Sequence, residues 1–407
     1  MHKNLALAAI VGVTLRLLFA FGYWTDQPLT RDEQEYLSLA RSLAAGRGFV
    51  SDLDRQPGQP DPFGRAPGYP AFLAVIGAGG PAATSVPPSV KVAQSLVGAG
   101  GIILIGLIAA RLAGPDAARI AAWLAACYPP LVWVSAYAFS EAIFWPVGLA
   151  AAWLCDRATS RLPRESRALI LAAGVVAGAG VLIRPAMVFF VALAGAWLLK
   201  RRALGLALIF VLGSAAVVAP WTMRNYRHHG RFVAVASEGG VTFWTGNHPL
   251  AIGEGDLAAN PDLKRASLAL RAQHPGLSEE QMEPVYYEEA FAWMRAHPWQ
   301  WLALELRKVF YLVVPIGPSY RLHSLLYYTA SVVSYALVLP AALIGLWRLG
   351  ARRRLTPGLW LLGASAVVTC VVFFPQERFR IPVIDPVLIV CAGALWLRDT
   401  RGEAGAA

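Results

Sequence analysis

The sequence predicts a mostly α-helical membrane protein: a bundle of about ten transmembrane helices with a small α/β cap formed by two outer loops. Three observations predict this class. Of the 407 residues, 57% are hydrophobic and only 15% are charged, whereas soluble domains average ~25% charged residues. The apolar residues come in runs of about 20, the length that crosses a bilayer as a helix. Basic residues gather in every second loop between these runs, which is the positive-inside pattern.

The predicted spans leave two long polar segments between them. They cover residues 4–24, 89–112, 117–136, 140–156, 168–184, 185–199, 203–222, 323–347, 358–375 and 381–397. The first run would also suit a signal peptide, but Arg16 interrupts it and no small-residue cleavage pattern follows, so an uncleaved span is predicted. The chain thereby divides into an N-terminal membrane region (1–222), an outer domain (223–322) and C-terminal membrane helices with a cytoplasmic tail (323–407).

The basic loops predict the orientation. Their residues are Lys3, Arg111, Arg119, Arg157, Arg161, Arg164, Arg167, Lys200, Arg201, Arg202, Arg348, Arg352, Arg353, Arg354, Arg398 and Arg401. All fall on one side if both termini are cytoplasmic, as in a multi-pass protein of a bacterial cytoplasmic (inner) membrane. The net charge of +11 therefore reflects membrane topology and not nucleic-acid binding. Segments 25–88 and 223–322 then lie on the extracytoplasmic face.

The first outer segment predicts a helix that begins after Thr30. Thr30 with Glu33 three residues on forms a capping box, and Gly46 ends the helix. Residues 54–68 are rich in Pro and Gly and predict a loop. The apolar stretch Tyr69–Gly79 is too short to cross a bilayer, so we expect a re-entrant or interfacial helix.

The second outer segment predicts a small domain of mixed structure. Arg231–Gly246 alternates enough for a β-hairpin that turns at Gly239-Gly240. Asp262–Ala272 and Ser278–Ala296 are predicted to be helices, and Ser278 with Gln281 is a second capping box. Leu302–Pro315 contains three charged residues, so it is predicted to lie along the outer membrane interface.

Asp32 and Glu33 form a pair of carboxylates in the first turn of the first outer helix. Two interpretations stay open. Acidic residues in a first turn favour the helix dipole, and Glu33 completes the cap. Alternatively, a carboxylate here acts as a general base on a hydroxyl group.

Arginines at the outer mouths of the spans predict an anion-binding cavity. Arg184 and Glu141 lie at adjacent mouths, and Arg378 with Arg380 lies in the last outer turn, where the positive-inside rule expects few basic residues. Arginine holds phosphate through its forked donors. Arg16 lies inside the first span, where it either reaches towards the interface or contacts an anion. No nucleotide-binding loop or metal-ligand spacing is present, so no metal site or other cofactor is predicted, although carboxylates would also suit a divalent metal.

The order of these pieces around the spans resembles the GT-C membrane glycosyltransferases, in the bacterial branch related to protein O-mannosyltransferases and lipid A aminoarabinose transferases. The resemblance runs over nearly the whole chain. It is carried by Asp32, Glu33, Tyr36, Ala40 and Gly46; Arg65 to Pro70; Tyr128 to Pro130 with Ser140 and Glu141; Leu182 to Pro185; Pro220, Trp221 and Arg224 to Tyr226; Gly246, Asn247 and Pro249; His297 and Pro298; and Glu377, Arg378, Arg380 and Pro382.

The resemblance implies a sugar donor carried on polyprenyl phosphate and presented on the outer face. It also implies an acidic catalytic residue in the first outer loop. That role falls on Asp32, with Glu33 beside it, and Asp61 and Glu141 are candidates for a second carboxylate. Because the outer domain is short compared with larger family members, contacts with the acceptor are not carried over. The acceptor would be an envelope glycan, a lipid or a protein.

A displacement at an anomeric carbon gives charge to the leaving phosphate, so cationic groups held ready there lower the barrier. Asp32 would take the acceptor proton. The residues predicted to bind the donor phosphate are Arg65, Arg184, Arg378, Arg380 and Arg16, and those predicted to line the cavity are Tyr69, Glu141 and Asn247. The lipid tail would lie between spans near Tyr69–Gly79.

Two other functions stay open from the sequence. A transporter or flippase of a lipid-linked sugar would also need intramembrane charges, but internal repeats and broken helices, which are typical of transporters, are not evident in the sequence. A non-catalytic envelope scaffold would explain the spans, yet it gives no reason for Asp32, Arg184 and Arg378 to face one side.

Overall fold

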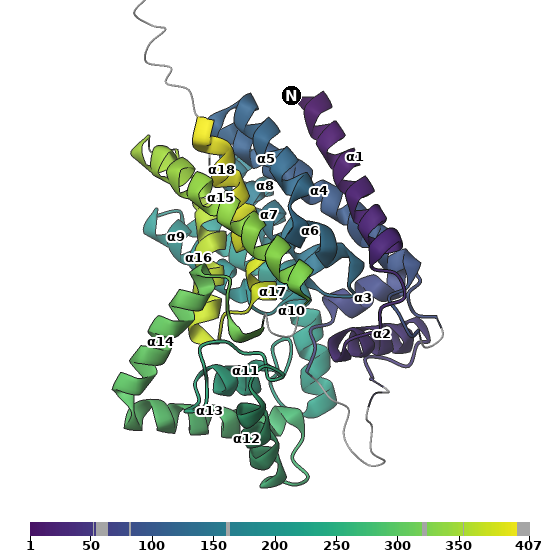
Figure 1. Cartoon of the computed structure of the whole chain (residues 1–407). Helices are drawn as coiled ribbons and strands as arrows, with labels where there is room; N and C mark the ends of the chain where they lie inside the picture. The colour runs from purple at the N-terminus through teal and green to yellow at the C-terminus, as the bar shows by residue number, and fades with distance from the viewer. Residues whose placement is uncertain are drawn as a thin grey trace, which may run out of the picture.

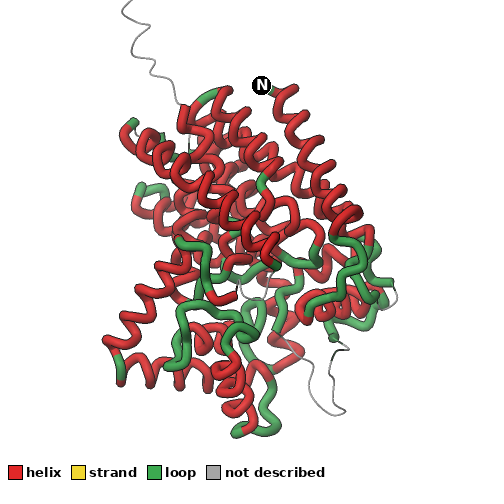
Figure 2. The backbone as a smooth tube through the Cα atoms, viewed as in Figure 1, coloured by secondary structure: helices red, strands yellow, loops and turns green. Residues whose placement is uncertain are grey.

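The structure is a computed structural model that describes residues 1–51, 53, 64–80, 83–159, 163–319, 324–352 and 354–396. Within these ranges all regular structure is helical (Figure 2). Of the residues discussed above, Asp61, Arg161, Arg353, Arg398 and Arg401 lie outside the described ranges, as does most of the loop predicted over 54–68.

Every predicted span coincides with a helix. The first is α1 (His2–Leu18), which continues into a short π-helix (η1, Phe19–Tyr23). The others are α4 (Pro88–Ala113), α5 (Pro115–Cys127) with α6 (Pro129–Trp133), α7 (Glu141–Ala158), α8 (Pro163–Ile183), α9 (Met187–Lys200), α10 (Leu204–His229), α15 (Leu325–Ala351), α16 (Pro357–Val372) and α18 (Ile384–Gly393).

The count of about ten spans stays a prediction. Five helical segments in the described residues are long and apolar enough to cross a membrane, namely α1 with η1, α4, α8, α10 and α15. A sixth span results if α5 and the segment Pro129–Ala136 count as one, although the two are bent by 61°. Helices α9, α16 and α18 are apolar but shorter.

The bend between α5 and α6 has a local cause. Pro129 and Pro130 lack backbone N–H groups, and a proline disfavours helical geometry in the residue before it. Tyr128 accordingly adopts an extended conformation, with φ −70° and ψ 112°. This is a broken helix that the sequence did not reveal.

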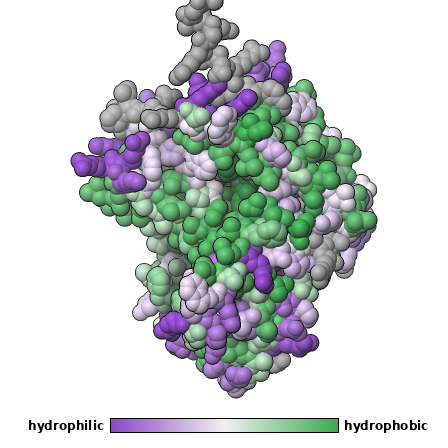
Figure 3. All heavy atoms as spheres, turned by 60° about the vertical axis from the view of Figure 1, so that its left-hand side comes forward, coloured by the Kyte–Doolittle hydropathy of each residue, from purple (hydrophilic) through white to green (hydrophobic). Residues whose placement is uncertain are grey.

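The bundle is closely packed through small residues. Helix α8 packs against α7 and α10, and α18 packs against α15 and α5. A Cβ atom on Gly345 of α15 would lie 1.9 Å from the carbonyl oxygen of Cys391 in α18, so only glycine permits this approach. Such contacts are typical of helices packed in membranes. In Figure 3, an apolar surface covers the bundle between hydrophilic residues at its two ends.

Two outer regions lie at one end of the bundle, opposite the N-terminus (Figure 1). The first contains α2 (Arg31–Ala44) and α3 (Gly68–Val75). The capping box of α2 is confirmed: the Thr30 hydroxyl accepts from the Glu33 backbone, and the Glu33 carboxylate accepts from the Thr30 backbone at 2.8 Å. The predicted short helix after Tyr69 is also present, as α3.

The second outer region contains α11 (Gly239–Gly246), α12 (Pro261–Ala272), α13 (Glu279–Ala296) and α14 (Pro298–Val313). It has its own small core. The core residues are Phe243, Trp244, Leu263, Leu270, Met282, Tyr286 and Ala290. The two helices predicted at 262–272 and 278–296 are therefore confirmed. The predicted boundary at 222 falls inside α10, which continues to His229.

The predicted β-hairpin at Arg231–Gly246 is wrong, and with it the α/β character of the cap. Gly239 and Gly240 begin α11 and do not form a turn between strands. The Gly240 N–H donates to Glu283 at 3.1 Å, and a Cβ on Gly240 would lie 2.8 Å from the Glu283 backbone. The glycine pair thus serves close packing of α11 on α13, a tertiary contact that alternation in the sequence does not report.

Helix α14 has one buried and one exposed apolar side. Leu304 and Leu312 are buried. The exposed side carries Trp299, Leu302, Leu306, Val309, Phe310 and Val313. An exposed apolar stripe at helical spacing is typical of a helix lying in a membrane interface, so the predicted interfacial position of this segment stands as a prediction.

Candidate active site

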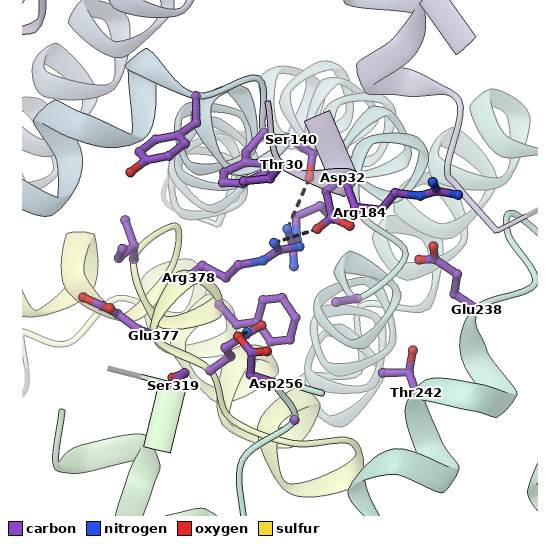
Figure 4. Close-up of a pocket in the computed structure, with 18 of the residues that line it drawn as sticks. Thr30, Asp32, Ser140, Arg184, Glu238, Thr242, Asp256, Ser319, Glu377 and Arg378 are labelled. Atoms are coloured by element: carbon purple, nitrogen blue, oxygen red, sulfur yellow. Dashed lines mark hydrogen bonds and ion pairs between the residues drawn. The ribbon is translucent and has the colours of Figure 1, made fainter. Parts of the chain in front are cut away.

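The cavity at the candidate site has a volume of about 710 Å³ and lies between the bundle and the outer regions. Its polar residues come from distant parts of the sequence. As Figure 4 shows, Asp32 and Arg378 meet near its centre, Glu238 lies on one side, and Glu377 and Ser319 lie on the other. The fold therefore collects the outer mouths of several helices around one polar space.

Asp32 is held between two guanidinium groups. Its Oδ1 lies 2.6 Å from Arg65 Nη2, and its Oδ2 lies 2.7 Å from Arg378 Nη1. The first turn of α2 positions the carboxylate, because the capping box fixes where the helix begins. Burial alone would raise the pKa of Asp32, but the two arginines outweigh burial and hold the pKa below its usual value. Asp32 is therefore a carboxylate anion at physiological pH.

Glu141 forms the floor of this charged cluster. It is 1% exposed, and its Oε1 forms ion pairs with Arg184 Nη1 at 2.6 Å and with Arg378 Nε at 3.2 Å. Arg184 Nη1 also lies 3.2 Å from the Ser140 hydroxyl oxygen. Arg378 thus bridges the two carboxylates, while Arg184 and Arg378 converge on one point.

Aromatic rings fix the two arginines in place. The Arg378 guanidinium lies 5.0 Å from the centre of the Phe139 ring, and that of Arg184 lies 4.9 Å from the Phe379 ring. Such cation–π contacts restrain a long side chain while leaving its N–H donors available. Both arginines line the cavity. Together they can hold an anion such as a phosphate.

Arg65 connects the first outer region to the second. Besides Asp32, it contacts Glu35 at 2.8 Å and Glu238 at 3.2 Å. Burial raises the pKa of Glu238 to about 7, with the charges of Glu35 and Asp32 adding to the effect and Arg65 opposing it. Because 43% of the Glu238 side chain is solvent-accessible, solvent moderates this shift.

The structure brings Asp32, Arg65, Arg184, Arg378 and Glu141 together, and their predicted roles stay predictions. Glu141, which was predicted to line the cavity, is not among its lining residues. Glu35 and Glu238 were not singled out. Glu35 lies three residues from Asp32, so one helical face brings the two together. Glu238 was hidden by the wrong hairpin prediction, and no local signal brings it to Arg65.

Two predicted arginines lie elsewhere. Arg380 is 4% exposed and pairs with Asp385 at 2.9 Å inside the bundle, below the cavity. Arg16 is fully buried and donates to the carbonyl oxygen of Gly12 at 2.9 Å, against Gly98 of α4. Neither lines the cavity.

Three further predicted site residues contribute to structure around the cavity. Glu33 accepts from the backbone N–H of Thr30 and of Ala138, at 2.8 and 2.9 Å, and so joins α2 to the segment before α7. Tyr69 is buried and donates to Gln94 at 2.7 Å. Asn247 is buried between α11, α14 and α16, where its oxygen accepts from Lys308 at 3.1 Å. None of the three lines the cavity.

A second, mostly apolar cavity of about 220 Å³ adjoins the first. The two share Arg184, Glu238, Thr242, Phe374 and Phe379 among their lining residues. The second cavity continues between α7, α9 and α16 along Phe144, Met187, Ala366, Cys370 and Phe373. An apolar space therefore opens beside Arg184, one of the arginines that line the larger cavity. Helix α3 does not line it, so the expected lipid site near Tyr69–Gly79 is not where the structure places such a space.

No group of three or more His, Cys, Asp or Glu side chains that would suit a metal ion occurs in the described ranges. Asp32, which lines the cavity, and the buried Glu141 are each paired with arginine. The arrangement is suited to binding an anion beside a carboxylate.

Comparisons with known proteins identify the fold. No protein-family model matches the chain, and no curated protein sequence matches it. Among solved structures it is similar to the archaeal oligosaccharyltransferase AglB from Archaeoglobus fulgidus, in complex with an inhibitory peptide and a dolichol-phosphate, with 18% identity and a TM-score of 0.57. The oligosaccharyltransferase of that organism tethered with an acceptor peptide gives 16% identity and a TM-score of 0.58. ArnT from Cupriavidus metallidurans, bound to undecaprenyl phosphate, gives 17% identity and a TM-score of 0.42.

These matches cover nearly all of this chain, but the share of the matched chain that is covered differs among them. AglB and the tethered oligosaccharyltransferase cover 97% of this chain, which spans about half (49%) of their length. ArnT covers 95% of this chain, which spans 76% of it. The likeness shows that the chain shares the fold of these oligosaccharyltransferases.

Proposed function

We propose that this protein is an integral membrane glycosyltransferase that moves a sugar from a polyprenyl-phosphate-linked donor to a hydroxyl acceptor. One observation carries the proposal: Arg378 pairs with the carboxylate of Asp32, and Arg184, which meets Arg378 at Glu141, also lines an apolar cavity. A lipid phosphate needs both an apolar channel and fixed cations. A sugar transferred from it needs a carboxylate on the other side. The shared fold agrees with this reaction class.

The donor would bind across the two cavities. Its isoprenoid tail would enter the apolar cavity between α9 and α16, and its phosphate would accept hydrogen bonds from Arg184 and Arg378. Forked guanidinium donors suit phosphate oxygens. The sugar would then lie in the larger cavity near Asp32.

The reaction would be a single displacement at the anomeric carbon. The acceptor oxygen forms a bond to that carbon, the bond from the carbon to the phosphate oxygen breaks, and the electron pair leaves with the phosphate. Arg184 and Arg378 stabilise the charge that develops there. Asp32 accepts the hydroxyl proton as general base.

The pairing of Asp32 explains how it becomes free to act. Without donor, Arg65 and Arg378 hold its two oxygens. A bound phosphate competes for Arg378, which releases Oδ2 and raises its basicity near the acceptor. Glu33 acts as a positioning residue, because its oxygens hold the start of α2 and the Ala138 backbone.

The location follows from charge and shape. The cavity is lined by residues of α2, α11 and α17, and these helices lie towards the end of the bundle opposite the N-terminus in Figure 1. With the basic loops cytoplasmic, the active site is extracytoplasmic, in a bacterial inner membrane. The acceptor then belongs to the cell envelope, as a glycan, a lipid or a protein.

The experiment compares wild type with Asp32→Asn in release of polyprenyl phosphate from sugar-loaded donors, using envelope extract as acceptor. We expect wild-type turnover and a ~10²–10⁴-fold slower variant that still binds donor. Asp116→Asn is the matched control, because that exposed carboxylate on α5 pairs only loosely with Arg119, at 3.7 Å. Equal turnover by Asp32→Asn would contradict the proposed base. Donor that is bound, never consumed, and moved across sealed vesicles would indicate a transporter instead.

A further inference from the structure

One wall of the larger cavity consists of aromatic residues that do not line the apolar cavity. It is formed by Trp133 of α6, Tyr137 after η2 (Val134–Ala136) and Tyr327 near the start of α15. None of these three residues lines the apolar cavity. The wall therefore borders only the larger cavity, whereas the proposed lipid tail occupies the apolar one.

Two of these rings form a stacked pair. Trp133 and Tyr327 have ring centres 4.3 Å apart and an interplanar angle of 26°. They come from helices far apart in the sequence. Tyr137 is itself stacked on Phe139, with ring centres 5.2 Å apart, so the wall presents rigid aromatic surface to the cavity.

Trp133 also has an unused donor. Its side chain is 6% exposed, and the indole Nε1–H has no hydrogen-bond partner within the described residues. A buried indole N–H usually finds a partner, and leaving one unmade costs free energy. Because this nitrogen is itself buried, a ligand oxygen would satisfy it after a small movement of the Trp133 or Tyr327 ring.

Acidic and polar groups complete this side of the cavity. Asp256 from the outer domain and Glu377 lie near Ser319 in Figure 4, on the side away from Glu238. Asp256 is held by Gln376 Nε2 at 3.2 Å and by the Ala258 backbone at 2.8 Å. The wall thus combines aromatic faces, a free N–H donor and fixed carboxylates.

We infer that this wall is the acceptor subsite of the proposed glycosyltransferase and that the acceptor is a carbohydrate. A pyranose ring has an apolar C–H face, which aromatic rings cover, and a rim of hydroxyl groups, which an indole N–H and carboxylates bind. The inference rests on the proposed function, because it concerns the second substrate of the same site.

The direction of attack assigns the wall to the acceptor and not to the donor sugar. In a single displacement the incoming oxygen approaches opposite to the leaving phosphate. Arg184 lines the apolar cavity as well as the larger one, whereas Trp133 and Tyr327 line only the larger one, so we assign these two rings to the acceptor, which approaches from the side away from the lipid. Its hydroxyl proton passes to Asp32, and its oxygen forms the new glycosidic bond while the phosphate leaves with the electron pair.

The test measures acceptor kinetics at saturating polyprenyl-phosphate-sugar donor. The acceptors are a set of tagged disaccharides, a glycolipid fraction of the envelope, and a Ser/Thr-rich peptide. We expect transfer to a saccharide or glycolipid and none to the peptide. Use of free disaccharides would indicate a soluble glycan acceptor, and use of glycolipid alone would indicate a lipid-anchored one.

Trp133→Phe keeps an aromatic ring but removes the N–H donor, so it should raise the acceptor KM ~3–10-fold and leave the donor KM unchanged. Tyr327→Ala should raise the acceptor KM by a similar factor. Tyr328→Ala is the matched control, because Tyr328 is its neighbour on α15 but does not line the cavity.

The outcomes separate this inference from the proposed function. If wild type consumes donor but glycosylates only the peptide, or if Trp133→Phe changes the donor KM and leaves the acceptor KM unchanged, the acceptor inference is overturned while the transferase stands. If wild type consumes no donor with any acceptor, the proposed function itself fails.

Discussion

Arg378 and Arg380 stand two residues apart in α17 (Glu377–Arg380), yet they belong to regions of opposite character. Arg378 is 31% exposed, lines the cavity and bridges Asp32 and Glu141. Arg380 is sealed inside the bundle, where it pairs with Asp385 and lies 4.1 Å from the centre of the Tyr335 ring. The same short turn therefore supplies one arginine to the site and one to the fold.

The difference shows how the site is held. Asp385 also accepts from the Tyr128 hydroxyl at 3.0 Å, at the break between α5 and α6. The sealed cluster thus joins α18, α15 and α5 directly below the turn that carries Arg378. We interpret the buried cluster of Arg380, Asp385 and Tyr128 as the structural support for Arg378 in the cavity.

The largest effect is expected on removing the sealed arginine. Arg380→Ala leaves Asp385 buried without its cation, and breaking such a pair costs about 3–5 kcal/mol. Thermal unfolding in detergent micelles should show a large loss of stability. The double variant Arg380→Met with Asp385→Leu should recover most of it, because a well-packed apolar pair replaces the ions. Equal stability of Arg380→Ala and wild type would show that the pair of Arg380 and Asp385 does not stabilise the fold.

The next largest effect is expected on turnover when Arg378, the arginine that lines the cavity, is replaced. Arg378→Ala should lower kcat ~10²–10³-fold, the usual cost of losing one donor to the developing charge, while the thermal unfolding midpoint changes much less than in Arg380→Ala. Donor-consumption assays on the folded variant measure this. If Arg378→Ala turns over as fast as wild type, Arg378 is not a phosphate ligand.

The smallest expected effect is on the pH dependence of stability, and it distinguishes Glu238 from Asp32. Because the folded-state pKa of Glu238 is raised to about 7 from the usual 4.5, the folded protein binds this proton more tightly than the unfolded chain. The contribution to stability is therefore complete below pH 4.5 and is lost as the pH rises through 7. Asp32 has the opposite sign, because its pKa is lowered.

Glu238→Gln should therefore remove part of the decline in thermal stability between pH 5 and 8. Unfolding midpoints at several pH values for wild type and variant give the comparison. Parallel curves for the two proteins would show that Glu238 does not titrate in this range.

How far the sequence predicts this structure depends on the range of the interaction. The capping box at Thr30 and Glu33 involves residues three apart, so the sequence predicts it correctly. The glycine pair at 239–240 is determined by packing on Glu283, and a local pattern predicted the wrong structure there. Charge bias predicts which end of the bundle a residue approaches, which is why Asp32, Arg184 and Arg378 were grouped correctly.

Charge bias does not predict how deeply a side chain is buried in the bundle. Arg380, Tyr69 and Asn247 lie near the correct end of the bundle, but packing turns their side chains away from the cavity. For Arg380 the partner Asp385 lies inside a predicted apolar span, a signal that would have indicated an internal ion pair. Glu238 has no such signal, because only the docking of the outer domain brings it to Arg65.

The bond from Tyr128 to Asp385 spans 257 positions of sequence, and this has a consequence for biosynthesis. A ribosome delivers α1 and α2 to the membrane long before α17 and α18. Until then Asp32 lacks Arg378, and Tyr128 lacks the carboxylate that locks the break. The pocket is consequently complete only after α17 has been synthesised, so a chain that stops before α17 would contain most of the helices described here and no complete site.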